Sequence, residues 1–493
     1  MATLAELVAS VHRGPRGAEI AACFDYDGTV IGGYSAQAFY NHRMRALEIG
    51  PVELARTLLA GARGIRSDED FAAFLEFSLA AWKDVEESEL EELGERLFRS
   101  DIARRLHTEV WEMLEAHRRM GHTLVLASSA TRFQVEPMAR ELGVDHALFT
   151  PVEVLAGRLT GRTAGPALWG GGKACALRAL AEEHDLDLER SYAYSNGDED
   201  VPFLEAVGHP VAVEPTSALR ADAQRRGWPV LRCASRRGRP GVLETARTVG
   251  FYGSFATAFG VGLGLGLLNR SRQTLVDITG GVGADVGLAL AGVDVAVVRG
   301  QQHVWSSRPC VFVFNHQSNI DPIVIMKVLR SGFTGVAKAE VKGIPGFGQF
   351  FQIAGVAFVE RGNTAQARKA LEPAVAKIRD ERLSLVIAPE GTRSVTPRVG
   401  RFKKGAFHIA MQAEVPMVPI VLRHAGAVMP RGAHTIREGR IEVVVMPPVM
   451  TSGWTVETLD DHVAEVRGMI ADTLDRWPGM PALPERATGA AVS

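Results

Sequence analysis

The sequence contains few cysteines, and their spacing suits neither a cross-link nor a metal site. Four occur in 493 residues and none forms a Cys-x-x-Cys pair; they are Cys23, Cys175, Cys233 and Cys310. A disulfide framework or a zinc knuckle is therefore not expected, and a reducing compartment fits the composition.

The sequence also lacks an excess of one charge, an internal repeat and a secretory signal. The net charge of -2 gives no indication that the chain as a whole binds nucleic acid. The first residues, MATLAELVASVHRG, have no long apolar core after a basic region, so we expect no cleaved signal. With 46% hydrophobic residues the composition is that of a folded protein, and 493 residues are too many for one hydrophobic core.

Short apolar segments alternate with helical patterns over residues 1–225. Strands are predicted within residues 19–30, 122–129, 190–198 and 209–215. Such alternation is typical of a parallel sheet in an α/β domain. A helical pattern at about residues 33–120 interrupts it, and we expect this block to form a cap over the sheet.

A basic stretch and an uncharged stretch follow. Residues 226–247 are rich in arginine and predict a linker, either as a solvated loop or as a contact with anionic lipid. Residues 248–269 carry no charge and are long enough to cross a bilayer, but six glycines weaken them as a helix in water. We predict a membrane-associating segment at 248–289, as a re-entrant or interfacial helical pair; a buried helix of a soluble protein is the alternative.

A second alternating region predicts a second α/β domain at residues 290–477. Its strand candidates lie at residues 293–298, 310–315, 357–360, 383–389, 418–423 and 441–447. The last residues, 478–493, have the composition of a disordered tail.

Two motifs of the second domain contain residues suited to proton transfer and to anion binding. His316 follows an apolar strand, and Asp321 lies five residues later, so a turn can bring this carboxylate onto the imidazole. A carboxylate there fixes the tautomer, and the other ring nitrogen can then take a proton from a hydroxyl. In the second motif Arg361 follows another strand and offers a planar set of donors to a phosphate.

Two further motifs lie near predicted strands. Residues 388–394 follow a buried strand, where Gly391 permits close approach of a ligand and Thr392 and Arg393 supply donors for an anion. Residues 415–419 contain Pro416 and Pro419, which stiffen the entry to the next strand.

In order and spacing these motifs resemble those of the 1-acylglycerol-3-phosphate acyltransferases, over roughly residues 290–450. The resemblance implies that His316 is the general base and that Asp321 orients it. It implies that the acceptor phosphate is held by Arg361, Glu390, Gly391, Thr392 and Arg393. It further implies that the neighbourhood of Pro416 shapes the site near the acyl donor, and that Lys338 matches a basic position between the first two motifs.

The N-terminal half carries a different set of polar residues. Asp25 and Asp27 come directly after the first strand, on one side of an extended backbone. Ser128 ends the next strand, and Lys173 lies at a predicted helix start. Asn196, Asp198 and Asp200 follow the strand within residues 190–198.

This order resembles the haloacid dehalogenase superfamily, in particular its phosphoserine-phosphatase-like branch, over about residues 19–225. The resemblance implies that Asp25 is the nucleophile and Asp27 the general acid and base, that Ser128 binds the phosphoryl group and that Lys173 offsets its charge. Mg²⁺ would be held by Asp25, the carbonyl of Asp27, Asn196 and Asp200.

One position departs from the superfamily pattern. With Asp200 aligned as the last carboxylate of the motif, Asn196 stands where another carboxylate is usual. An amide oxygen can bind Mg²⁺ but brings no charge, and Asp198 would compensate only if the loop shifts. A degraded phosphatase fold with a structural or regulatory role is therefore the alternative for this half.

The sequence thus predicts an α/β chain: a Rossmann-like parallel-sheet phosphatase domain with a helical cap, then an α/β glycerolipid acyltransferase domain with an apolar helical segment at its start. The expected reaction is acyl transfer from an acyl thioester, of coenzyme A or acyl-carrier protein, to lysophosphatidate. Another lysophospholipid acceptor is the alternative. The expected partners are these substrates and membrane lipid, with no nucleic acid, and the expected location is the cytoplasmic face of a membrane.

Overall fold

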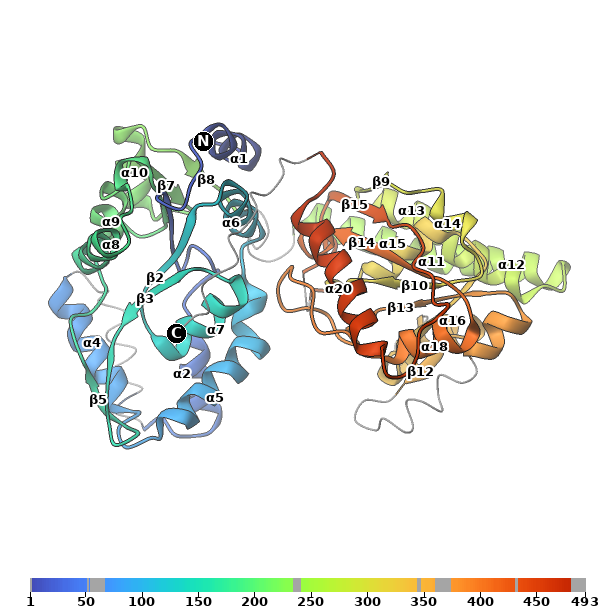
Figure 1. Cartoon of the computed structure of the whole chain (residues 1–493), viewed down its shortest axis with the longest axis horizontal. Helices are drawn as coiled ribbons and strands as arrows, with labels where there is room; N and C mark the ends of the chain where they lie inside the picture. The colour runs from blue at the N-terminus through green and yellow to red at the C-terminus, as the bar shows by residue number, and fades with distance from the viewer. Residues whose placement is uncertain are drawn as a thin grey trace. The chain divides into compact units, whose positions relative to one another are not determined.

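The fold comes from a computed structural model, which describes residues 2–50, 53, 67–233, 241–343, 347–359, 374–430 and 433–479. The chain divides into two compact units with the boundary between residues 237 and 238 (Figure 1). Each unit contains its own sheet and its own hydrophobic core.

The first unit is built on a six-stranded sheet with the order β3-β2-β1-β6-β7-β8. All pairings are parallel. The strands are β1 (Ala21–Asp25), β2 (Thr123–Thr131), β3 (His146–Thr150), β6 (Tyr192–Ser195), β7 (His209–Val213) and β8 (Val230–Leu231). Every residue of β1 is buried, as expected for a central parallel strand that is covered on both faces.

Helices cover both faces of this sheet. They are α1 (Leu4–Arg13), α6 (Thr108–Met120), α7 (Arg132–Leu142), α8 (Gly171–Glu183), α9 (Val201–Glu205) and α10 (Ser217–Arg226), with the short turns η3 (Leu188–Arg190) and η4 (Asp198–Asp200). Cys23 of β1 packs in one cluster with Leu177 of α8 and Leu219 of α10. Phe24 points to the opposite face, where its ring lies 6.0 Å from that of His117 in α6.

The cap differs from the prediction at its C-terminal end. Its helices are α2 (Ala36–Arg45), α4 (Asp68–Ala80), α5 (Glu87–Leu97), η1 (Phe98–Ile102) and η2 (Ala103–Arg105). The predicted block at 33–120 extends too far, because α6 packs against α1 and β2 of the sheet domain. A hairpin that the sequence analysis missed, β4 (Val152–Leu155) and β5 (Arg158–Thr163), packs against α4.

The predicted linker at 226–247 is also too long. Strand β8, at Val230–Leu231, pairs with β7 and belongs to the first sheet. Helix α11 (Val242–Leu268) begins six residues before the predicted apolar segment at 248. The remaining stretch between these elements is short, and its residues 234–240 lie outside the described part of the chain.

The second unit contains a seven-stranded sheet with the order β12-β11-β13-β10-β14-β15-β9. Only β14 and β15 pair antiparallel. The strands are β9 (Val293–Arg299), β10 (Val311–Phe314), β11 (Phe333–Lys338), β12 (Ala357–Val359), β13 (Ser384–Ile387), β14 (Met417–Arg423) and β15 (Gly439–Val445). Because β10 and β13 are parallel neighbours, the residues that follow them meet at one edge of the sheet.

Helices again lie on both faces of the sheet. They are α12 (Arg272–Asp277), η6 (Ile278–Val282), α13 (Gly283–Leu290), α14 (His303–Ser306), α15 (Asp321–Leu329), η7 (Ala339–Gly343), α16 (Phe347–Ile353), α18 (Gly405–Ala413), α19 (Ala425–Val428) and α20 (Leu459–Asp475), together with α11. Phe312 of β10 packs with Phe255 of α11 and Val324 of α15. Val313, on the other face, packs with Phe407 of α18 and Leu459 of α20.

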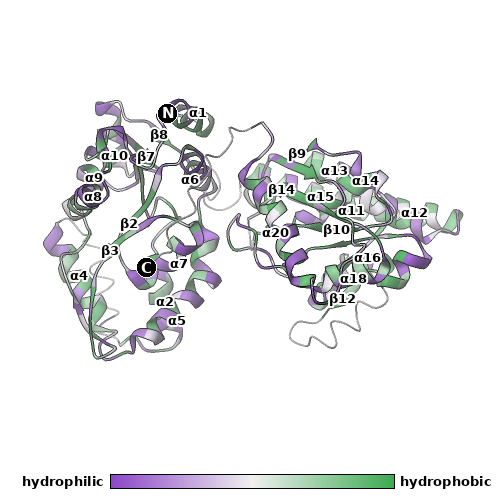
Figure 2. Ribbon diagram, in the orientation of Figure 1, coloured by the Kyte–Doolittle hydropathy of each residue, from purple (hydrophilic) through white to green (hydrophobic). Residues whose placement is uncertain are grey.

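The predicted apolar segment forms a helical pair. Helix α11 packs along its length against α12, η6 and α13, which return in the opposite direction. One stripe of α11 is buried, including Phe251, Phe255 and Ala258. Among the described residues α11 is the one helix long and apolar enough to cross a membrane, and Figure 2 shows its largely hydrophobic colouring.

Candidate active sites

The first candidate site lies at the end of β10 in the second unit. His316 follows β10, and Asp321 is the first residue of α15. His316 Nδ1 lies 2.7 Å from Asp321 Oδ2, and the carboxylate is fully buried while 21% of the imidazole is exposed. Nδ1–H therefore points to the carboxylate, and Nε2 is left as the nitrogen that can accept a proton.

The backbone around Asp321 explains this arrangement. Oδ2 also accepts the N–H groups of Gln317 and Ser318, at 2.7 and 2.8 Å. The N-terminus of α15 adds a favourable field for the negative charge. The carboxylate is thus held in place independently of the imidazole, and it can orient the ring as the sequence predicted.

Asn315 continues the sheet contacts beyond β10. Its side-chain amide donates to the carbonyl of Leu422 at 2.9 Å and accepts the Leu422 N–H at 2.8 Å. The fully buried side chain thereby imitates a paired strand residue. Two hydrogen bonds to Leu422 of β14 therefore fix the residue that directly precedes His316.

Glu390 has different surroundings from those that the family resemblance implied. The side chain is 4% exposed, and Oε1 accepts the N–H of His316 at 2.8 Å. Oε2 accepts the Ser394 hydroxyl at 2.6 Å and the Gly400 N–H at 3.0 Å. Burial raises the pKa of Glu390, although these three hydrogen bonds act to lower it. Both carboxylate oxygens are therefore occupied by donors of the protein.

The other residues of this loop are more accessible. Gly391 has φ +66°, a conformation that favours glycine, and Thr392 is exposed. A Cβ at Gly391 would lie 3.1 Å from the Nζ of Lys403, so an ammonium group lies beside this loop. Lys403 was missed from the sequence, although the run Arg401-Phe-Lys-Lys after the motif offered a basic signal.

Two predicted residues remain apart from this group. Arg361 lies outside the described residues. Lys338 ends β11, and its ammonium group pairs with Glu340 at 2.9 Å. The structure therefore brings together His316, Asp321 and the loop at 390–394, while the placement of Arg361 stays a prediction.

Pro416 does not lie near His316. The N–H of Val311 donates to the Pro416 carbonyl at 3.0 Å, so Pro416 lies beside the start of β10. His316 follows the end of that strand, about 16 Å away at about 3.3 Å per residue. Pro416 therefore lies at the opposite edge of the sheet, and its part in shaping the site near the acyl donor stays a prediction.

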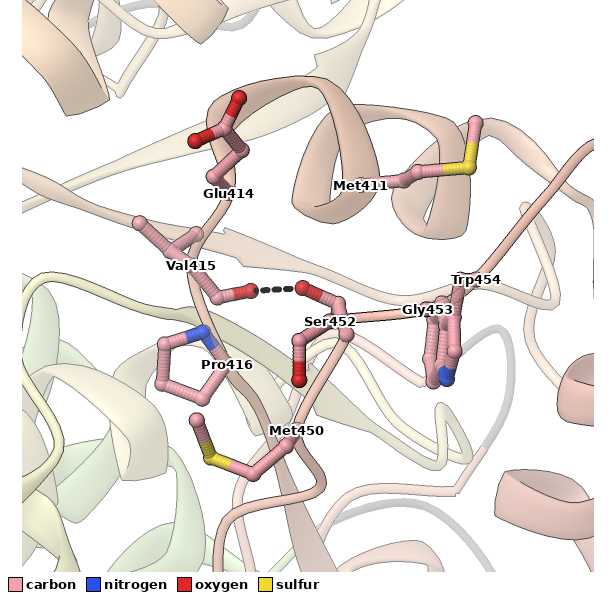
Figure 3. A pocket seen from close by; sticks show the side chains of 9 residues that line it. Met411, Glu414, Val415, Pro416, Met450, Ser452, Gly453 and Trp454 are labelled. Carbon is pink, nitrogen blue, oxygen red and sulfur yellow. Dashed lines mark hydrogen bonds between the residues drawn. The ribbon is translucent and has the colours of Figure 1, made fainter.

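A cavity of about 470 Å³ lies at this opposite edge (Figure 3). Its lining residues come from the end of α18, the start of β14 and the loop after β15; they are Met411, Glu414, Val415, Pro416, Met450, Thr451, Ser452, Gly453 and Trp454. Thr451 donates its hydroxyl to the Val415 carbonyl at 2.9 Å. The cavity is therefore separate from the His316 site.

The second candidate site lies at the end of β1 in the first unit. Lys173, in the first turn of α8, donates to Asp25 Oδ1 at 2.6 Å and to Asp200 Oδ2 at 2.7 Å. All three side chains are buried. Burial raises the pKa of Asp25 to about 7, with Lys173 lowering it and Asp200 adding to the rise. The structure thus joins three of the predicted residues.

Thr29 connects Asp25 with Asn196, a link that the sequence analysis missed. Its hydroxyl lies 2.8 Å from Asp25 Oδ2 and 3.2 Å from Asn196 Oδ1. Gly28 has φ +85°, and a Cβ there would lie 2.3 Å from the Asn196 amide nitrogen. Glycine is needed at 28 because the Asn196 side chain lies directly against the turn.

Asp27 is placed for proton transfer. Its carboxylate accepts the Ser35 N–H at 2.6 Å and the Ser35 hydroxyl at 3.1 Å. Burial raises the pKa of Asp27 to about 6, so the carboxyl group can gain and lose a proton near neutral pH. Ser128 lies on β2 one residue beyond Ala127, which pairs with Asp25, and therefore reaches the same edge.

The oxygen atoms of this site suit a hard cation, although the site carries less negative charge than one with a carboxylate at position 196. Asp200 Oδ1 is buried and has no hydrogen-bond partner among the described residues. Asp198 Oδ1 accepts the Thr216 hydroxyl at 2.9 Å, so compensation for Asn196 would still require the loop to shift. The described residues contain no cluster of three or more His, Cys, Asp or Glu side chains that could hold a metal. The predicted set of two carboxylates, a carbonyl and an amide still fits Mg²⁺ by its chemistry.

Comparison with known proteins finds two families in the chain. A family model described as acyltransferase matches residues 295–423, and one described as haloacid dehalogenase-like hydrolase matches residues 22–205. These ranges contain the two candidate sites.

Individual relatives agree with these matches. The 1-acyl-sn-glycerol-3-phosphate acyltransferase of Limnanthes alba is 34% identical over 185 residues, which cover 38% of this chain and 65% of the relative. A putative hydrolase of Mycobacterium tuberculosis is 33% identical over 246 residues, 48% of this chain and 80% of the relative. The crystal structure of the 1-acyl-sn-glycerophosphate acyltransferase from Thermotoga maritima is 24% identical, with a TM-score of 0.42, and covers 48% of this chain and 97% of that chain. The chain spans slightly less than two thirds of the first acyltransferase relatives.

Proposed function

Because the chain belongs to the haloacid dehalogenase-like hydrolases through residues 22–205 and matches the acyltransferase family model over residues 295–423, we propose that it acylates lysophosphatidate to phosphatidate. The observation that carries this proposal is the contact of His316 with a buried, independently fixed Asp321. Relatives that bear the name 1-acyl-sn-glycerol-3-phosphate acyltransferase support the choice of acceptor.

In the proposed reaction His316 is the general base. Its Nε2 takes the proton of the free glycerol hydroxyl, and the oxygen attacks the carbonyl of an acyl thioester. The C–O bond forms and the negative charge moves onto the carbonyl oxygen. Its return breaks the C–S bond, and the leaving thiolate takes the proton from the imidazolium, which regenerates the base. Asp321 stabilises the imidazolium between these steps. The donor is the thioester of coenzyme A or of acyl-carrier protein.

The acceptor phosphate is proposed to bind beside this base. Arg361, Thr392 and Arg393 supply donors, and Gly391 allows the phosphate to approach the backbone. Lys403, next to Gly391, adds a positive charge.

We also propose that the second unit works at the cytoplasmic face of a membrane. Helix α11 buries one stripe against α12, η6 and α13, and α13 packs on β9 and α15 of the sheet domain. Apolar side chains on the rest of the helix are exposed, including Val261, Leu267 and Leu268. A helix held along the domain in this way suits insertion into one leaflet better than crossing the bilayer.

For the first unit we propose a phosphomonoesterase activity that depends on Mg²⁺. Asp25 attacks the phosphorus atom, and Asp27 gives a proton to the leaving oxygen and later takes one from water. Ser128 and Lys173 bind the phosphoryl oxygens. Mg²⁺, held by Asp25, Asp200, Asn196 and the Asp27 carbonyl, would offset the negative charge that approaches Asp25.

A binding or regulatory module is the second candidate for this unit, and Asn196 favours it. An amide replaces a carboxylate at the proposed metal site, and Asp198 is engaged elsewhere. The unit then keeps the phosphatase fold and binds a phosphate ester without turnover.

One set of assays tests these proposals. Purified full-length protein is given lysophosphatidate or other lysophospholipids, each with acyl-coenzyme A and with acyl-carrier-protein thioester. Formation of phosphatidate is the expected result. If the protein acylates another lysophospholipid but not lysophosphatidate, that other lysophospholipid is the acceptor. Phosphate release from small phosphomonoesters, with and without Mg²⁺, distinguishes the two candidates for the first unit.

A further inference from the structure

The loop after β13 surrounds the backbone of the catalytic base. The N–H of His316 donates to Glu390 Oε1 at 2.8 Å, and the carbonyl of His316 accepts the Ser394 N–H at 2.7 Å. The side-chain amide of Gln317 donates to the Pro397 carbonyl at 2.8 Å. Both backbone groups of His316 are therefore bonded to residues 390–394.

Glu390 is the centre of these contacts. Three donors reach its two oxygens: the His316 N–H, the Ser394 hydroxyl and the Gly400 N–H. A carboxylate accepts all three only when it is ionised, because a protonated carboxyl group adds a donor of its own. A Cβ at Gly400 would lie 2.7 Å from Oε2, so the backbone at 400 is packed directly against the carboxylate.

The same contacts argue against a role for Glu390 in holding the phosphate. Phosphate and carboxylate repel one another, most strongly where burial excludes water. The side chain is 4% exposed, and neither oxygen offers a proton to a ligand. The neighbouring Thr392 is exposed and can reach an anion instead.

We infer that Glu390 is a positioning residue, which fixes the backbone of His316 and couples the loop that receives the acceptor phosphate to the catalytic base. This inference rests on the proposed acyltransferase function. Movement of residues 391–393 on binding a phosphate would be transmitted to His316 through Glu390 and Ser394. An acceptor with a phosphate would then align the base better than an acceptor without one.

The test separates binding from catalysis in the full-length protein. Without an acyl donor and without Mg²⁺ neither proposed activity consumes lysophosphatidate, so its Kd can be measured directly, and kcat follows from assays with donor. Glu390→Gln retains the size of the side chain. Its amide nitrogen, however, must face the backbone N–H of either His316 or Gly400, so one of these hydrogen bonds is lost. We expect kcat to fall about a hundredfold, as small misplacements of reacting groups do, with Kd within about threefold of wild type.

Two matched variants complete the design. Glu465→Gln makes the same change at an exposed carboxylate of α20, 56% accessible, and should leave both constants unchanged. Ser394→Ala removes only the hydroxyl donor and should lower kcat by several-fold at constant Kd; it carries the test if Glu390→Gln shows no cooperative melting transition.

The outcomes are distinct. If Glu390→Gln raises Kd tenfold or more and retains kcat, Glu390 contributes to binding of the acceptor phosphate and the inference is overturned. An unchanged kcat with an unchanged Kd would overturn it as well. If wild-type protein makes no phosphatidate, the proposed acceptor fails instead, and the same comparison is made with the lysophospholipid that it does acylate.

Discussion

Oδ2 of Asp321 lies 2.7 Å from Nδ1 of His316 and accepts two backbone N–H groups in addition. The carboxylate therefore keeps its position when the imidazole changes its protonation state. This distinguishes an orienting group from a surface ion pair, which depends on two mobile side chains.

Substitution of either member of this pair should stop acyl transfer without unfolding the second unit. His316→Ala removes the base, which typically costs about a hundredfold to ten-thousandfold in rate. Asp321→Asn places an amide opposite Nδ1, so the ring loses its fixed tautomer and kcat should fall by a similar factor. Initial rates of phosphatidate formation measure both effects, and circular dichroism checks the fold. Near-wild-type rates in His316→Ala would rule out the general-base mechanism.

The first unit gives a prediction about Asn196. Asn196→Asp restores a negative charge beside Asp25 while Oδ1 can still accept the Thr29 hydroxyl. Because affinity for hard cations rises with the number of charged ligands, the Mg²⁺ concentration for half-maximal phosphate release should fall on the order of tenfold. Asp25→Asn should abolish release.

A second measurement makes this prediction independent of turnover. Mg²⁺ stabilises the native protein in proportion to its affinity, so the rise in Tm with Mg²⁺ should be larger in Asn196→Asp than in wild type. Equal shifts in both proteins would mean that residue 196 is not a ligand. Absence of turnover at every Mg²⁺ concentration in both would support the binding-module alternative.

The sequence predicted those parts of the sites that depend on residues close together in the chain and on the ends of predicted strands. His316 and Asp321 are five residues apart at the end of a buried strand, so a single turn decides their contact. Asp25 and Asp200 follow strands that periodicity identifies, and parallel pairing brings such ends to one edge. The resemblance to known families supplied their roles.

The sequence did not predict contacts that depend on backbone groups of distant segments. Glu390 reaches His316 because β13 and β10 are neighbours, and its partner is an N–H group that no residue type reveals. Strand β8 has two residues, too few for a periodic pattern. The β4–β5 hairpin turns at Ala156 and Gly157, which both have positive φ, and in the sequence only the glycine marks such a turn.

The exposed end of α11 gives a prediction about the membrane. The side chains of Leu267 and Leu268 are 71% and 79% exposed. The double substitution Leu267→Gln/Leu268→Gln removes apolar contact with lipid, where burial of one leucine contributes roughly 1.5–3 kcal/mol. Binding to phospholipid vesicles in a flotation assay should weaken at least about tenfold, since about 1.4 kcal/mol is a factor of ten.

The control for this prediction uses apolar residues outside α11. Met450→Gln/Val456→Gln changes two side chains of comparable exposure, 62% and 63%, and should bind vesicles as wild type does. Equal loss in both double variants would mean that α11 is not the specific contact with lipid.

A buried chain of hydrogen bonds in the first unit fixes two histidines in the neutral state. His122 Nε2 lies 2.9 Å from the Pro15 carbonyl and must donate to it. His122 Nδ1 then accepts from His117 Nδ1 at 2.8 Å, and His117 Nε2 accepts the Tyr194 hydroxyl at 2.7 Å. A proton added to His122 would place two N–H groups against each other, and a proton added to His117 would place an N–H group against the Tyr194 hydroxyl, which now donates to that nitrogen.

This chain should make the first unit sensitive to acid. Burial lowers the pKa of His117 well below 6.5, with the neighbouring histidines adding to the effect, and burial also lowers the pKa of His122. The unfolded chain takes up these protons below about pH 6.5, whereas the folded chain does not. The stabilisation is therefore complete above about pH 6.5, and it is lost as the pH falls from there toward the lower folded-state pKa values. Each histidine contributes up to about 1.4 kcal/mol per pH unit.

Urea unfolding of the full-length protein at pH 7.5, 6.5 and 5.5 measures this dependence. The carboxyl groups of Asp25 and Asp27, whose pKa values are raised, take up protons in the folded chain over the same range and act in the opposite direction. The contribution of the histidines is therefore read from variants: between pH 6.5 and 5.5 the free energy of unfolding of wild type should fall by about 1 kcal/mol relative to that of His117→Gln. His117→Gln can still donate to His122 and accept from Tyr194 but does not titrate, so it should reduce this pH dependence. His184→Gln, at an exposed histidine of the same unit, should retain it. An unchanged pH dependence in His117→Gln would show that the acid sensitivity has another source, because only the buried chain requires His117 to stay neutral.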